Sequence, residues 1–162
     1  MGASQIKRRA FTLVEILIVV VILGILAAVV IPQFSDAAET AKASSLVSQL
    51  QTVRSQLELY MIQHNGNYPS LGSNWNQLTQ TTSVSGATSG SDFGPYLQKS
   101  PINPFENSSS VDEGNNALGT AAAGVGWVYN PDNGQIKAVV NASKATTLSL
   151  STEDVATYSS TE

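Results

Sequence analysis

The chain has 162 residues, eight of them basic and twelve acidic, which gives a formal net charge of −4 at pH 7. This length suits one globular domain beyond a membrane anchor. The acidic balance argues against general nucleic-acid binding, which needs clustered basic side chains. Because the sequence contains no cysteine, a disulfide-stabilised fold is excluded.

The first ten residues have the composition of a short cytoplasmic leader. They end in the basic triplet Lys7, Arg8 and Arg9, and basic residues beside an apolar segment favour the cytoplasmic side of a membrane. Ala10, a small residue, separates this triplet from Phe11. Removal of the leader changes the net charge from −4 to −7, because it takes away three basic side chains.

An apolar segment of 21 residues extends from Phe11 to Ile31. As a helix it is about 31 Å long, which matches the hydrocarbon core of a bilayer. Glu15 is its one charged residue. An acid inside a spanning helix is by default a functional candidate, although near a helix end it can also extend to the lipid headgroups. A cut between Ala10 and Phe11 places a new α-amino group four residues from Glu15, where the two charges can neutralise each other within one chain or between chains.

This N-terminal pattern closely resembles the class III signal of type IV pilins and type II secretion pseudopilins. In that family a small residue ends the leader, a phenylalanine begins the mature chain, and an acid stands fifth; here these are Ala10, Phe11 and Glu15. Pro32 matches a proline that is common near the end of the apolar segment. Ala10 departs from the glycine that the family most often has.

The resemblance implies the maturation, the partners and the location of the chain. Prepilin peptidase is expected to cleave between Ala10 and Phe11, Phe11 to be N-methylated, and Glu15 to act in subunit assembly. The expected partners are other copies of the chain in a helical filament, the inner-membrane assembly machinery and the membrane itself. The chain is thus expected in the bacterial cytoplasmic membrane as a single-pass protein and then in an extracytoplasmic or surface filament.

The alternative interpretation of the N-terminus is an ordinary secretory signal peptide. It accounts for the basic triplet and the apolar run. However, the apolar region of such a peptide is typically about 7–15 residues, and it has no need of Glu15.

The expected fold is α+β, with a long N-terminal helix packed on a small antiparallel β-sheet head. The expected segments are a leader at 1–10, a membrane-spanning or filament-core helix at 11–34, an amphipathic helix at 35–64 and a globular head at 65–162. Gly24 and Pro32 are potential helix breakers. Apolar residues that recur at steps of three and four, including Ala43, Val47, Leu50 and Leu57, predict that one face of the second helical half is buried. Arg54 and Glu58 are spaced as a helical ion pair.

The head sequence contains one strong hairpin signal. Two apolar runs, Gly126–Tyr129 and Gln135–Val140, flank a Pro-Asp-Asn-Gly turn. We also expect a short helix within Ser73–Gln80 and a short edge strand near Thr147–Leu150.

The candidate metal ligands are Glu106, Asp112 and Glu113, which precede the hairpin. Carboxylate oxygens are the ligands that calcium prefers, but their spacing matches no known motif, so a solvated acidic loop is the favoured interpretation over a calcium site. No cofactor is otherwise expected. His64, the single histidine, is expected to be structural. The sequence shows no nucleophile–base set, so we do not expect an enzyme.

The sequence therefore favours a structural subunit, pilin or pseudopilin, of a membrane-assembled filament of a type IV pilus or a type II secretion system. The alternative is a monomeric, helix-anchored envelope protein whose head binds a ligand. Glu15 discriminates between the two, because a simple anchor has no need of an acid within the membrane.

Overall fold

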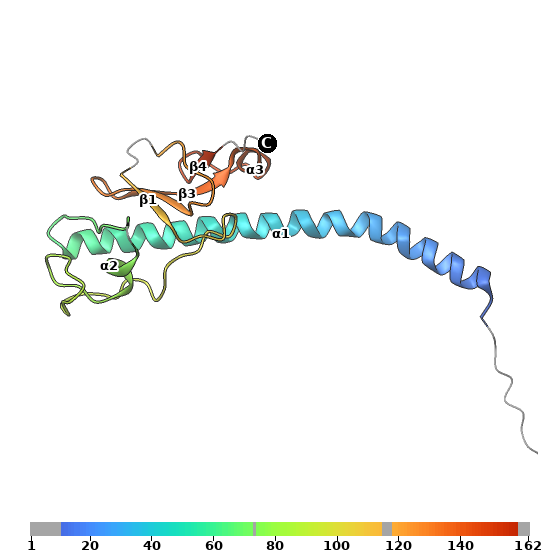
Figure 1. Cartoon of the computed structure of the whole chain (residues 1–162), viewed down its shortest axis with the longest axis horizontal. Coiled ribbons are helices and arrows are strands. Elements are labelled where there is room, and N and C mark those ends of the chain that lie inside the picture. The colour runs from blue at the N-terminus through green and yellow to red at the C-terminus, as the bar shows by residue number, and fades with distance from the viewer. Residues whose placement is uncertain (1–10, 73, 115–117, 159–162) are drawn as a thin grey trace, which may run out of the picture. The chain divides into compact units, whose positions relative to one another are not determined.

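The computed structural model describes residues 11–72, 74–114 and 118–158 (Figure 1). In chain order the elements are α1 (Leu13–Gln63), α2 (Asn76–Thr79), β1 (Val111–Glu113), β2 (Trp127–Asn130), β3 (Gln135–Asn141), α3 (Ala142–Thr147) and β4 (Val155–Tyr158). The chain divides into two units, Met1–Ala38 and Glu39–Glu162, and α1 contributes to both. The expected α+β class is confirmed, whereas the expected leader lies outside the described residues.

The first unit consists, in its described part, of the N-terminal portion of α1. Every side chain from Phe11 to Ala38 is exposed. The helix continues without a break through Gly24 and Pro32. Proline removes one backbone donor, and that single loss does not end a helix whose flanking turns remain hydrogen-bonded. Among the described helices, α1 is the one long and apolar enough to span a membrane.

The second half of α1 has one face buried against the head, as the sequence predicts. Its buried residues alternate at steps of three and four: Ala43, Leu46, Leu50, Val53, Leu57 and Tyr60. Leu46 takes the core position that was expected for Val47, which is only partly buried. The helix stops at Asn65 and Gly66, which both have positive φ, and the Gly66 amide donates to the carbonyl of Met61 at 2.9 Å. This is a left-handed helix terminus.

The head contains a four-stranded sheet in the order β1-β2-β3-β4. The pair β2 and β3 is antiparallel, with Trp127 opposite Ala138, so the expected hairpin is confirmed. However, β1 runs parallel to β2 and β4 runs parallel to β3, so the sheet is mixed rather than antiparallel. Parallel neighbours need long connections, and these leave no local turn signal in the sequence.

The two faces of the hairpin pack in two separate clusters. The larger cluster joins one face of the sheet to the buried face of α1 and to α2, through Trp127, Tyr129, Ile136, Ala138 and Val140 on the sheet side. The smaller cluster lies on the other face and contains Leu118, Val128, Val139 and Ala156. Both faces of β2 and β3 are therefore covered, which makes this hairpin the centre of the head.

The prediction of a short edge strand near Thr147–Leu150 is wrong. Residues Ala142–Thr147 form α3, and the last strand, β4, comes later. The Asn141 side chain accepts a hydrogen bond from the Ser143 amide at 3.0 Å and so caps the helix. An N-cap asparagine satisfies an amide that would otherwise lack a partner, which favours a helix at this point.

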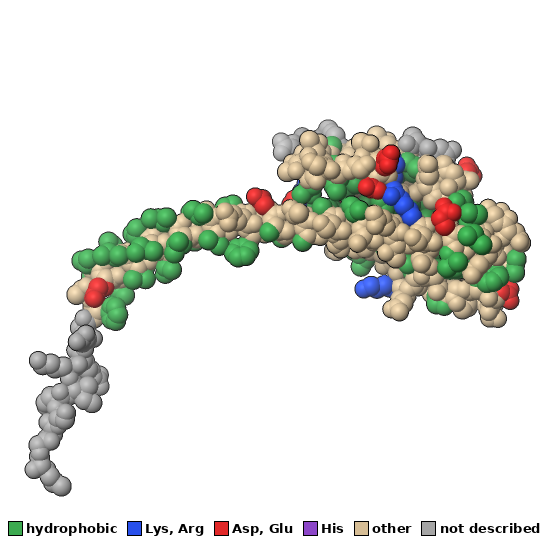
Figure 2. Space-filling view, turned by 180° about the vertical axis from the view of Figure 1, so that it is seen from behind, with side chains coloured by type: hydrophobic (Ala, Val, Ile, Leu, Met, Phe, Trp, Pro, Cys, Tyr) green, Lys and Arg blue, Asp and Glu red, His purple; other side chains and the backbone are tan. Residues whose placement is uncertain are grey.

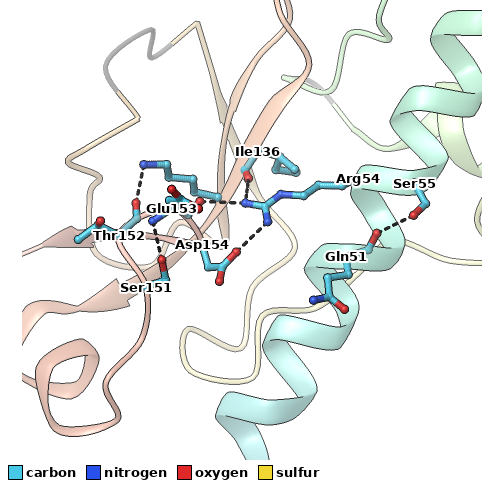
Figure 3. Close-up of polar contacts among 9 residues, drawn as sticks. Gln51, Arg54, Ser55, Ile136, Ser151, Thr152, Glu153 and Asp154 are labelled. Carbon is cyan, nitrogen blue, oxygen red and sulfur yellow. Dashed lines mark hydrogen bonds and ion pairs between the residues drawn. The ribbon is translucent and has the colours of Figure 1, made fainter.

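Arg54 fastens the C-terminal segment to α1 (Figure 3). Its Nη1 donates to Oδ1 of Asp154 at 2.7 Å, and its Nη2 donates to the carbonyl oxygens of Ile136 and Glu153 at 3.1 and 2.9 Å. One guanidinium thus joins the helix, β3 and the turn before β4. Charge-assisted bonds of this kind are stronger than neutral ones.

The helical ion pair expected between Arg54 and Glu58 is not formed, because Arg54 points to the sheet and Glu58 accepts a bond from Tyr68. A second ion pair, at 2.7 Å, joins Lys144 of α3 to Glu39 of α1. The hydrogen bond from Lys144 lowers the pKa of the Glu39 carboxyl below its ordinary value. Both contacts tie the last described residues, 142–158, to α1 without a disulfide.

We expect Arg54→Ala to destabilise the head by about 1–3 kcal/mol, because it leaves Asp154 and two carbonyl oxygens without their donor. Partial exposure of both side chains moderates the loss. Thermal unfolding of the full chain in detergent measures it. The control Lys99→Ala should change stability by less than about 0.5 kcal/mol, and equal effects of the two changes would contradict the role of Arg54.

Candidate functional site

The N-terminus of α1 is closed by a reciprocal pair of residues, Thr12 and Glu15. Oε2 of Glu15 accepts hydrogen bonds from the Thr12 amide at 2.8 Å and from the Thr12 hydroxyl at 2.9 Å. In return the Glu15 amide donates to the Thr12 hydroxyl at 3.2 Å. This is a capping box, which satisfies backbone donors that have no partner inside the helix.

The capping box fixes where the Glu15 carboxylate lies. Helical side chains lean towards the N-terminus, and the bonds to Thr12 hold the carboxylate at that end, on the side of Phe11. The positive end of the helix dipole favours a negative charge there. Both bonds from Thr12 are to Oε2, and Oε1 accepts none from the described residues. The acid therefore retains acceptor capacity for a further cation.

Sequence reasoning found Glu15 and missed Thr12. The signal was present, since Thr12 and Glu15 form the T-x-x-E pattern of a capping box directly before an apolar run. The sequence analysis considered the charge of Glu15 and not its position in the first turn of a helix, where it can cap the helix. The structure places the expected cleavage residue Phe11 beside this box; Ala10 lies outside the described residues.

The helix surface around Glu15 is apolar, and among the described residues Thr12 alone donates hydrogen bonds to the Glu15 carboxylate. Figure 2 shows hydrophobic side chains over the N-terminal part of α1, with an acidic side chain near its start. Phe11 is 77% exposed and Leu13 is 81% exposed. An apolar surface of this extent is covered by lipid or by another protein.

The candidate metal ligand Glu113 pins a loop of the head. Its carboxylate accepts bonds from the Ser70 hydroxyl at 3.0 Å, from the Leu71 amide at 3.1 Å and from the Gly72 amide. These donors belong to the segment that follows α1 in the chain. The carboxylate thus holds this segment against β1.

Glu106 pins a different loop. Its Oε2 accepts from the Gly124 amide at 2.9 Å and its Oε1 from the Tyr158 hydroxyl at 2.8 Å. The hydrogen bond to Glu106 raises the pKa of the Tyr158 phenol above its ordinary value. Asp112 and Glu113 are consecutive in β1, so their side chains leave opposite faces of the strand. The three candidate ligands are not brought together, and the described residues contain no group of three or more His, Cys, Asp or Glu that could hold a metal ion.

The interpretation of His64 as structural is confirmed. Its side chain is buried, and its ring nitrogens lie 2.8 Å from the carbonyl oxygen of Tyr60 and 3.0 Å from the hydroxyl of Thr82. The ring stacks on that of Tyr60, with centroids 3.7 Å apart. Both polar atoms are satisfied at the end of α1.

Comparison with known proteins gives two family matches. Residues 6–31 match the prokaryotic N-terminal methylation motif, and residues 33–119 match the protein G family of the type II secretion system. The second match covers more than half of the chain. No solved structure matches the chain significantly.

Three curated relatives carry the name "Type II secretion system core protein G". The protein of Pectobacterium carotovorum is 32% identical over 104 residues, which are 64% of this chain and 66% of the relative. That of Pseudomonas aeruginosa is 33% identical over 101 residues, 62% of this chain and 70% of the relative. That of Escherichia coli K12 is 29% identical over 101 residues, 62% and 69% of the two chains.

The matches confirm the resemblance that the N-terminal residues carry, and they extend it into the head. The alignments span about two thirds of each relative's length. The chain belongs to the protein G family of the type II secretion system, and it begins with the prokaryotic N-terminal methylation motif.

Proposed function

We propose that this chain is a structural subunit of the secretion pseudopilus, a helical filament that assembles from the membrane. The observation that carries the proposal is a carboxylate, Glu15, that is bonded to Thr12, the residue after Phe11, at the start of an exposed apolar helix. Membership of the protein G family supports a secretion filament over a pilus. In the filament the apolar parts of α1 pack together, and the heads form the outer surface.

Glu15 selects and aligns the incoming subunit in this proposal. Prepilin peptidase cuts before Phe11 and creates an α-amino group that is cationic below a pKa of about 7.7–8.0. At about 4 Å and an effective dielectric constant of 20, this group and a carboxylate attract by about 4 kcal/mol before desolvation is subtracted. An amine from the neighbouring subunit aligns two helices along their axes, whereas an amine from the same chain recruits nothing.

The subunit waits in the cytoplasmic membrane before it joins the filament. The segment 11–34 spans the bilayer, with the leader on the cytoplasmic side until it is removed. The inner-membrane assembly machinery then moves the subunit outward. The family resemblance implies that the segment between Gly24 and Pro32, through which α1 is continuous here, can loosen within the filament.

The first prediction of the proposed function concerns maturation. The Ala10–Phe11 junction follows a basic triplet and precedes the helix cap, so the mature chain should begin at Phe11 and carry an N-methyl group. Mass analysis of the chain from cells that contain prepilin peptidase measures both. An N-terminus beyond Val30 would instead indicate an ordinary signal peptide.

The second prediction concerns calcium. Because Glu106 and Glu113 already accept hydrogen bonds from the chain, millimolar calcium should hardly change the unfolding temperature of the full chain in detergent. Tight binding to the native state alone would raise that temperature by mass action. A rise of many degrees that Asp112→Ala abolishes would contradict this prediction.

The third prediction concerns Glu15. Glu15→Ala removes the charge, so cleavage and membrane insertion should persist while filament assembly fails or slows at least about tenfold. Glu15→Gln keeps the shape and much of the hydrogen bonding but not the charge, and it should impair assembly as well. Electron microscopy of filaments and immunoblots of membranes measure the two readouts.

The matched control is Thr12→Val, which removes the hydroxyl of the capping box and keeps the carboxylate charge. It should weaken the helix cap, by about 0.5–2 kcal/mol at most, and leave most assembly intact. Normal filaments from Glu15→Ala subunits, in the absence of any wild-type chain, would contradict the role of Glu15 in assembly and make the acid a tolerated interfacial residue.

A further inference from the structure

Two tripeptides of the head have the form Asn-x-Ser with no proline at the middle position. They are Asn107-Ser108-Ser109 and Asn141-Ala142-Ser143. This form is the acceptor sequence for N-linked glycosylation, in which the asparagine amide nitrogen receives an oligosaccharide. Because the transferring enzyme must reach both the asparagine amide and the hydroxyl two residues later, the structure decides which of the two tripeptides can serve.

The tripeptide at Asn141 is held in regular structure. Asn141 ends β3, lies opposite Tyr158 of β4, and caps α3. Its Oδ1 accepts hydrogen bonds from the Ser143 amide at 3.0 Å and from the Ser143 hydroxyl at 2.5 Å. The side chains that the enzyme must bind are therefore bonded to each other, and access to them requires loss of the helix cap.

The tripeptide at Asn107 is open to solvent. Asn107 is exposed in a tight turn that is closed by a hydrogen bond of 2.9 Å from the Asn103 amide to the Ser108 carbonyl oxygen. Its φ of 49° lies in the left-handed region, which asparagine tolerates better than most residues. The Asn107 side chain and the Ser109 hydroxyl make no hydrogen bond to the described residues. Ser109 is fixed instead through its carbonyl oxygen, which accepts from Nε1 of Trp75 at 2.7 Å.

Asn107 also borders a polar groove of about 510 Å³. Residues 71, 72 and 74 line one side of it, and residues 107–111 line the other. None of these described lining residues is charged, and most offer an amide or a hydroxyl group, as Asn74 and Ser110 do. Such groups both donate and accept hydrogen bonds, as the hydroxyls of a sugar do. A sugar attached to Asn107 therefore has space and bonding partners beside it.

We propose that Asn107 is a site of N-linked glycosylation and that the first sugar of the glycan lies in this groove. The donor is an oligosaccharide linked to a lipid diphosphate, and the catalyst is an oligosaccharyltransferase at the outer side of the cytoplasmic membrane. Nδ2 of Asn107 loses a proton and bonds to C1 of the sugar, while the bond from C1 to the diphosphate oxygen breaks and the lipid diphosphate leaves. The modification rests on the proposed function, since it needs a head that lies outside the cytoplasm.

The glycan lies beside a free edge of the sheet. β1 is the first strand in the sheet order, and its first residue, Val111, lines the groove. An unpaired strand edge is a template for association with another chain. A bulky, hydrophilic glycan at this place keeps other strands away from β1.

Tandem mass spectrometry of the full chain, isolated from the cell that makes it, tests this proposal. The peptide that contains Asn107 should carry a carbohydrate mass on the asparagine amide, and the peptide that contains Asn141 should carry none. Asn107→Asp keeps the shape and the tolerance of positive φ but removes the amide nitrogen, so it should lose the added mass. Ser109→Ala removes the hydroxyl of the acceptor sequence and should lose the mass as well.

Three matched variants should keep the carbohydrate mass. Ser109→Thr retains the hydroxyl, Ser108→Ala changes only the middle position, and Asn141→Gln removes the other tripeptide. An unmodified Asn107 in chains whose leader has been removed would overturn the glycosylation and leave the filament function standing. A mass that persists in Asn107→Asp, or equal modification of Asn141, would overturn it too. Chains that keep their leader and do not expose the head outside the cytoplasm would overturn the proposed function, and this modification with it.

Discussion

Glu15 is the one charged side chain of the apolar segment from Phe11 to Ile31, and the assembly that we propose depends on how this charge is balanced. Within the single chain the balance comes from Thr12, whose amide and hydroxyl both donate to Oε2. These are neutral donors, which stabilise a carboxylate less than a cation does. Transfer into a core of packed helices would increase the cost of an unpaired charge, which is why we propose that the α-amino group of the next subunit pairs with Glu15.

In the head, a polar C-terminal segment is held to α1 without a disulfide. Residues 142–158 bury only Ala145, Val155 and Ala156 among their apolar side chains. Arg54 compensates with three charge-assisted bonds from α1, and Lys144 adds an ion pair to Glu39. The same helix that bears the membrane segment therefore also fixes the last strand of the head.

Local signals in the sequence predicted the parts of the fold that depend on neighbouring residues. The long helix, its end near residue 64 and the hairpin all follow from periodicity and turn chemistry. The parallel pairing of β1 with β2 and of β4 with β3 was not predicted, because it joins residues whose separation in sequence leaves no local pattern. Glu106 and Glu113 were identified as acids, but their donors lie on distant loops, so only the structure shows that they pin these loops. Thr12 was predictable and missed, since its signal is the spacing to Glu15.

The most direct test is the position of the Glu15 carboxylate in the assembled filament. A reconstruction by electron cryomicroscopy at a resolution that shows side chains would measure the distance from each Glu15 carboxylate to the nitrogen of every nearby Phe11. We predict a separation of about 4 Å or less to the Phe11 nitrogen of a neighbouring subunit. A carboxylate that pairs only with its own chain, or that lies in contact with no amine, would contradict the role of Glu15 in joining subunits.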